Sequence, residues 1–135
     1  MVYKYFEHLA DCGIIGIGNS IEESFEEAAK AMFNLMTNIS KLQKTRKVKI
    51  SVSASNNAEL FVEFLNELLS LADLNGIMFC DFKIKIEKDN LEGFAFGDNV
   101  SKKMELKQEV KAATYSQLEI KKEKGKIISK TVVDL

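Results

Sequence analysis

The sequence predicts a single α+β domain in which two main helices pack on one face of a mostly antiparallel sheet. Three observations predict this fold class. Two segments repeat apolar residues at helical spacing, several shorter segments alternate apolar and polar residues, and strand-like segments dominate after the second helical one. The chain has 135 residues, 46% of them hydrophobic, and no proline or evident linker, so we expect one domain over residues 1–135 with its own core.

The first expected strand spans residues 3–8, and the glycine-rich segment 11–19 then turns the chain around a short extended piece. Ser20 is expected to begin the first helix, because Ser20 and Glu23 have the spacing of a capping box. The buried face of this helix is predicted from apolar residues at helical spacing: Ile21, Phe25, Ala28, Ala29, Met32, Phe33 and Met36.

The middle of the chain predicts a strand followed by a second helix. Segment 47–54 alternates apolar residues with lysine and serine, which is typical of a half-buried strand. Segment 58–74 is more apolar than the first helix, so we expect a more buried one, ended by Asn75-Gly76. Segment 104–110 is expected to be extended or a short helix. The remaining strands are expected at 77–87, 91–96, 117–123 and 126–133, the last two forming a hairpin.

The charge pattern excludes one class of function. The formal net charge is -1, which argues against a general nucleic-acid binder. The basic residues nevertheless gather in two clusters, and we favour the interpretation that these lysines block edge-to-edge strand pairing. A phosphate-binding face is the alternative. The clusters are Lys41, Lys44, Arg46, Lys47 and Lys49, and Lys121, Lys122, Lys124, Lys126 and Lys130.

The cysteine pattern and the apolar segments bear on compartment. Cys12 and Cys80 form no CxxC pair, and the first residues lack the pattern of a secretory signal. No apolar run approaches the length that a membrane-spanning helix needs. We therefore expect a reduced, cytoplasmic protein without a membrane partner, in which Cys12 is a small apolar filler.

Two acids at the ends of apolar runs suggest a metal site. Asp134 is the penultimate residue of a β-type run, beside the carboxylate of Leu135, and Asp11 follows the first strand. If the two terminal strands are neighbours, these oxygens could share Ca²⁺, Mg²⁺ or Mn²⁺. Spacing alone favours the alternative that both acids only end their strands in water.

Two further residues are candidates for supporting roles. His8 is the single histidine, which excludes a histidine-rich zinc site, and a structural hydrogen bond is favoured over direct ligation. Lys111 lies among small and apolar residues, where it could pair with Asp11 or Asp134 or offer a charge to a partner. A surface lysine is the alternative.

Six segments in order resemble the archease family. The opening Phe6-Glu7-His8-Leu9-Ala10-Asp11-Cys12-Gly13-Ile14 is similar to the family's EHTADIG signature, and Glu109-Val110-Lys111-Ala112-Ala113-Thr114-Tyr115 to its EVKAxTY block. The other similar segments are 20–29, 33–38, 64–69 and 132–135, so the resemblance covers residues 3–135. The chain departs from the family pattern at Leu9, Cys12, Asn38 and Met104, and Asn38 stands where an acid is common.

The resemblance implies a function. Archeases are non-catalytic activators of the GTP-dependent tRNA-splicing RNA ligase: they promote its guanylylation and repeated turnover in RNA end joining. It implies a divalent metal, calcium, bound by Asp11, Asp134 and Leu135, and a role for Lys111 in activating the partner; we assign His8 to the same role. RNA would be contacted only through the ligase.

Two other functions stay open. One is a chaperone-like interaction module for RNA-processing enzymes, in which the metal is structural. The other is a metal-dependent phosphoesterase, which needs a general base near the ion, and the single histidine counts against it.

Overall fold

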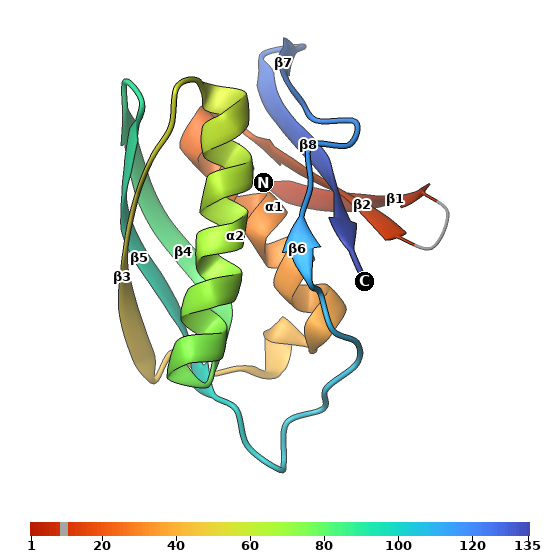
Figure 1. Cartoon of the computed structure of the whole chain (residues 1–135), viewed down its shortest axis with the longest axis vertical. Helices are drawn as coiled ribbons and strands as arrows, with labels where there is room; N and C mark the ends of the chain where they lie inside the picture. The colour runs from red at the N-terminus through yellow and green to blue at the C-terminus, as the bar shows by residue number, and fades with distance from the viewer. Residues whose placement is uncertain (9–10) are drawn as a thin grey trace.

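The computed structural model describes residues 1–8 and 11–135, in which antiparallel strands form two sheets around two helices (Figure 1). The first sheet has the order β1-β2-β8-β6, and β7 also pairs with β8. The second has the order β3-β5-β4. The strands are β1 (Val2–His8), β2 (Asp11–Gly18), β3 (Arg46–Ser53), β4 (Ile77–Glu87), β5 (Asn90–Asn99), β6 (Ala112–Ala113), β7 (Glu119–Glu123) and β8 (Lys126–Asp134).

Two helices, α1 (Ile21–Met36) and α2 (Asn57–Asn75), confirm the predicted α+β class, and a short 3₁₀ helix, η1 (Ile39–Lys41), follows α1. The strands form two separate sheets, whereas the sequence predicts a single sheet. Figure 1 shows the helices between the two sheets, and α1 contacts strands of both. The chain therefore leaves the first sheet through α1, builds the second sheet around α2, and returns to the first.

Segment 11–19 is a strand over most of its length, not a turn. Its glycines allow α1 to approach β2 closely: a Cβ on Gly16 would lie 1.9 Å from the backbone oxygen of Ser24. Only a residue without a side chain fits there. Glycine in a sequence signals both turns and such close contacts, and here the second applies.

Both helices begin and end as local sequence dictates. The hydroxyl of Ser20 accepts a hydrogen bond from the backbone N–H of Glu23 at 3.1 Å, as predicted. The Glu23 carboxylate accepts from the N–H of Asn19 at 2.6 Å, one residue earlier than in a regular capping box. Gly76 has φ 64 and ends α2 in the left-handed conformation.

The core lies where both helices meet the second sheet. Its largest buried side chains include Phe25, Phe33, Phe61, Phe64 and Phe79, several in ring–ring contact. Because these rings come from α1, α2 and β4, the core links elements that are distant in sequence. None of the helices that the structure describes has both the length and the apolar character to cross a membrane.

Candidate functional site

The two strands from opposite ends of the chain are neighbours, and they bring the two predicted aspartates together. β2 and β8 pair antiparallel with Cys12 opposite Val133, and Asp11 and Asp134 follow as the next residues along. Residues opposite one another on such strands have Cβ atoms about 4.5–5.5 Å apart and share a face of the sheet. One cation could therefore contact both carboxylates.

Solvent reaches this pair of acids only in part. Both side chains are half-buried, and neither forms an ion pair within the part of the chain that the structure describes. Strand alternation places Cys12 on the side of β2 that packs on the core, so Asp11 faces the opposite side. Two like charges at this distance repel, and a bound cation would relieve that repulsion.

The backbone of Lys111 lies next to the backbone of Asp134. Its N–H donates a hydrogen bond to the Asp134 carbonyl at 2.8 Å, and Ala112 pairs with Asp134 across β6 and β8. The Lys111 side chain is exposed, and it forms no ion pair with the described acids. Lys111 is therefore a surface lysine, and the backbone hydrogen bond holds it beside Asp134.

The other predicted site residues have different surroundings. Leu135 packs partly buried against the core, which anchors the chain after Asp134. His8 pairs with Asp11 across the β1–β2 hairpin, but its side chain, Leu9 and Ala10 lie outside the described residues. The Cys12 thiol is half-buried, and burial raises its pKa, as expected for a packing residue rather than a nucleophile.

The donor set can be tested against a divalent cation. Asp11, Asp134 and the main-chain oxygens of Leu135 are hard ligands of the kind that Ca²⁺ prefers. Among the described residues, no group of three or more His, Cys, Asp or Glu side chains is placed to hold a metal. Ca²⁺ takes about 6–8 oxygens, so these residues fit an open site whose remaining ligands come from water or a partner.

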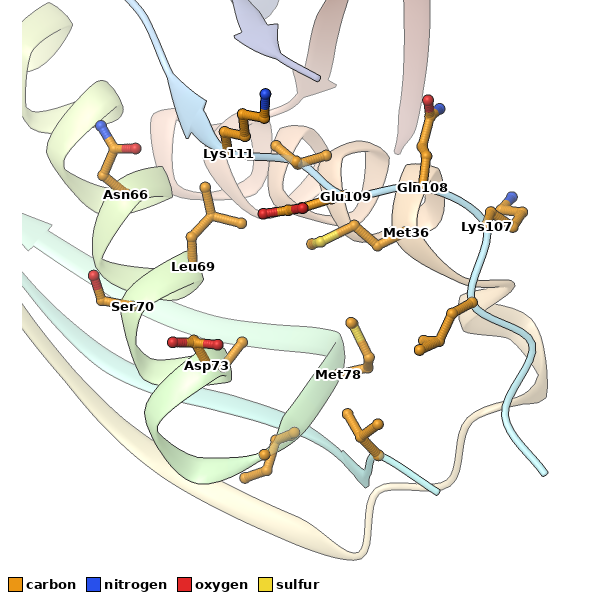
Figure 2. A pocket seen from close by; sticks show the side chains of 16 residues that line it. Met36, Asn66, Leu69, Ser70, Asp73, Met78, Lys107, Gln108, Glu109 and Lys111 are labelled. Carbon is orange, nitrogen blue, oxygen red and sulfur yellow. The ribbon is translucent and has the colours of Figure 1, made fainter. Parts of the chain in front are cut away.

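A groove begins beside Lys111 and runs between α2 and the extended segment 100–111 (Figure 2). Its volume is about 910 Å³. Figure 2 shows Met36, Leu69 and Met78 around the space, while Lys107 and Lys111 point away from it. The sequence gives no sign of this groove. The exposure of the Leu106 side chain, at 57%, becomes apparent only in the structure. Segment 104–110, which we expected to be extended or a short helix, contains no helix. Its residue Leu106 forms an isolated antiparallel β-bridge with Thr37.

A second group of acids lies between α1 and β4, where each acid has a protein partner. The carboxylates of Glu22 and Glu26 accept hydrogen bonds from the backbone N–H groups of Ile86 and Ile84, at 3.3 and 2.9 Å. These N–H groups belong to the outer edge of β4, so α1 satisfies an otherwise open sheet edge. No local pattern around Glu22 or Glu26 in the sequence predicts this role.

Asp81 belongs to the same group and binds lysines. It pairs with Lys44 at 2.7 Å and with Lys30 at 3.7 Å, and Lys30 also contacts Glu27 at 3.0 Å. Elsewhere, Asn38 caps η1, where its side-chain oxygen accepts from the backbone N–H of Ser40 at 3.2 Å. The side chain of Asn38 therefore has a structural role as the N-cap of η1.

The fold and its site define a class: a small α+β protein that carries two adjacent acids on strands from its two ends. Comparison with protein families matches residues 3–135 to the Archease protein family. The chain belongs to the archease family. It is 40% identical to a protein archease of Pyrococcus furiosus over 125 residues, covering 89% of this chain and 88% of the relative.

Further relatives agree with this assignment. A protein archease of Methanothermobacter thermautotrophicus is 36% identical and covers 98% of both chains. The solution structure of Methanobacterium thermoautotrophicum protein 1598 matches with a TM-score of 0.88 at 34% identity, again over 98% of both chains. A Thermotoga maritima crystal structure described as an archease and possible chaperone has the same fold, with a TM-score of 0.66 at 24% identity over 98% of this chain and 96% of that chain.

Proposed function

We propose that this chain is a non-catalytic activator of the GTP-dependent tRNA-splicing RNA ligase. It would promote guanylylation of the ligase and repeated turnover, and this activation would act on the ligase protein and require no contact between the two aspartates and RNA. Membership of the archease family supports this role, and the adjacency of Asp11 and Asp134 is the single observation on which the mechanism rests.

The proposed mechanism is electrostatic. When bound, a divalent cation, calcium in our proposal, would supply a concentrated positive charge that can orient phosphate or carboxylate oxygens. Asp11 and Asp134 would hold it together with the main-chain oxygens of Leu135. Because these residues fill only part of a calcium shell, the sheet end keeps coordination positions for groups of the partner.

Two neighbouring residues would serve the contact with the ligase. The Lys111 side chain is exposed beside Asp134. Its ammonium can therefore bind an acidic group of the partner without first breaking a buried ion pair. His8 lies opposite Asp11 in the hairpin register and would orient that acid. The groove that begins at Lys111 offers further apolar contact area. We place this activity in the cytoplasm, since both cysteines are free in the structure.

The test is a multiple-turnover ligation assay with the cognate ligase. We expect the protein to raise product well above one ligation per ligase molecule, and Asp11→Ala or Asp134→Ala to behave like omission. Asp89→Ala, which removes an exposed acid in the β4–β5 turn, is the matched control and should activate fully. Full activation by folded Asp11→Ala would exclude the mechanism.

A chaperone-like interaction module is the second candidate, and the groove favours it. Met36 and Met78 line the groove, and methionine adapts to varied partners. In this alternative the metal only stabilises the fold. Capture of the ligase should then be unaffected by a chelator at low temperature, whereas the activator mechanism predicts that the chelator abolishes stimulation of turnover.

A further inference from the structure

The outer face of the second sheet carries a feature that the ligase role does not use. Figure 1 shows both helices on one side of β3, β5 and β4, which leaves the other side uncovered. Ile50, Ala95 and Ile84 are buried on the helix side. By strand alternation, Lys49, Phe94 and Lys83 therefore face outward.

The register brings these three residues into one row across the sheet. Phe94, on the central strand, is opposite Lys49 on β3 and opposite Lys83 on β4. The ammonium of Lys47 lies 4.1 Å from the centroid of the Phe94 ring. Phe94 is 36% exposed. We call Lys47, Lys49, Lys83 and Phe94 the Phe94 platform.

Protection of a sheet edge does not explain this arrangement. Lysines on β3 can block an edge, but Phe94 lies on β5, which is paired on both sides. An exposed aromatic ring on a central strand is a surface on which a planar group can stack. Phe96, two residues on, is half-buried on the same face and lengthens the aromatic surface.

The acidic side chains on this face limit the size of the basic area. Asp81 is held by Lys44, and Glu87 lies 3.4 Å from Lys85, so neither leaves an unpaired charge. Glu92 is exposed next to Phe94 and bounds the basic area. Three lysines around one ring suit a short stretch of a single strand.

We propose that the Phe94 platform binds single-stranded nucleic acid, with one base stacked on Phe94 and the flanking phosphates bound by Lys47, Lys49 and Lys83. Aromatic rings that stack bases beside basic side chains are the general means by which proteins hold single strands. Lys47 covers the ring in the free protein. A stacked base holds a ring more strongly than an exposed ammonium does, so Lys47 can move to a phosphate.

Fluorescence of a single introduced tryptophan tests the stacking. The chain contains no tryptophan, so Phe94→Trp gives one reporter. The probes are an eight-nucleotide oligouridylate and an oligodeoxythymidylate, which compare RNA with DNA. We expect saturable quenching by at least one probe and none by a duplex of equal length. Tyr115→Trp, at a site that is 57% exposed, is the control and should not respond.

Binding of fluorescein-labelled probes then tests the remaining residues. Phe94→Leu should weaken binding at least about fivefold, as expected for loss of one stacked base. Lys49→Glu or Lys83→Glu should weaken it and make it less salt-dependent, by about 0.7 in the log–log slope per lost phosphate contact. Lys122→Glu, in the other basic cluster, should change neither. Absence of binding up to about 1 mM, unquenched fluorescence of the Phe94→Trp variant or equal affinity for polyglutamate would overturn the proposal.

Discussion

The acids between α1 and β4 and the acids at the start of β2 and the end of β8 have opposite surroundings. Glu22 and Glu26 accept backbone hydrogen bonds, and Asp81 pairs with two lysines. Asp11 and Asp134 lie next to one another with no ion-pair partner among the described residues. The acids of the first group stabilise the fold through these contacts. Two adjacent carboxylates repel each other unless a positive group lies between them, which is why we propose a cation site at the second group.

The largest effect expected is a change in stability on adding cation. A hundredfold excess over the dissociation constant stabilises a folded protein by about 2.7 kcal/mol, which corresponds to roughly 8 °C for a chain of this size. Ca²⁺ should raise the melting temperature of the protein, but not that of Asp134→Asn. Without cation, Asp134→Asn should be at least as stable as the unchanged protein because one repelling charge is gone.

Differential scanning calorimetry with and without Ca²⁺ measures both quantities. Glu26→Gln is the matched control, since it removes a charge from the other group of acids and should keep the full response to Ca²⁺. An equal response in Asp134→Asn would remove the distinction between the two groups.

The next effect concerns the edge of β4. Glu26→Ala leaves the N–H of buried Ile84 without its acceptor, which should cost about 2 kcal/mol of unfolding free energy. Glu26→Gln keeps an acceptor oxygen and should cost much less. Burial raises the pKa of Glu26, and the hydrogen bond from the N–H of Ile84 opposes that rise. Urea unfolding of the two variants checks the difference, and equal losses would mean that the hydrogen bond contributes little.

The smallest effect concerns Asp81. Burial alone would raise its pKa, but the hydrogen bond from Lys44, the N–H of Phe82 and the charge of Lys30 together lower it. A carboxyl with a lowered folded-state pKa stabilises the protein above its unfolded pKa, and this stability is lost as pH falls through the folded-state value. Lys44→Ala should therefore move the loss of stability to higher pH. An NMR titration of Asp81 checks this, with Lys41→Ala as the unaffected control.

The features predicted correctly from the sequence are those that neighbouring residues determine. Ser20 begins α1 and Gly76 ends α2 because each acts within one turn of helix. The sequence also predicts that strands from the two ends of the chain are neighbours, and β2 does pair with β8, although Asp11 begins β2 and does not end a strand. Whether Asp11 and Asp134 bind a metal stays a prediction.

The features that the sequence analysis missed depend on contacts between distant segments. The hydrogen bond from Ile84 to Glu26 joins residues 58 positions apart, and nothing near either residue signals it. The groove forms only when segment 100–111 lies across α1 and α2, through contacts such as Lys107 N–H to the carbonyl of Met36. Division into two sheets likewise follows from α1 packing between strands that do not pair.

The position of β8 has a consequence for synthesis of the protein. β8 pairs with β2, β6 and β7, so a strand that leaves the ribosome after every other strand of the first sheet lies inside that sheet. Residues 46–99 can pair among themselves during translation, whereas the N-terminal hairpin waits for residues 126–134 before it gains its second neighbour. The acidic pair can therefore form only after residue 134 has emerged, and a product that terminates before β8 would have no such pair.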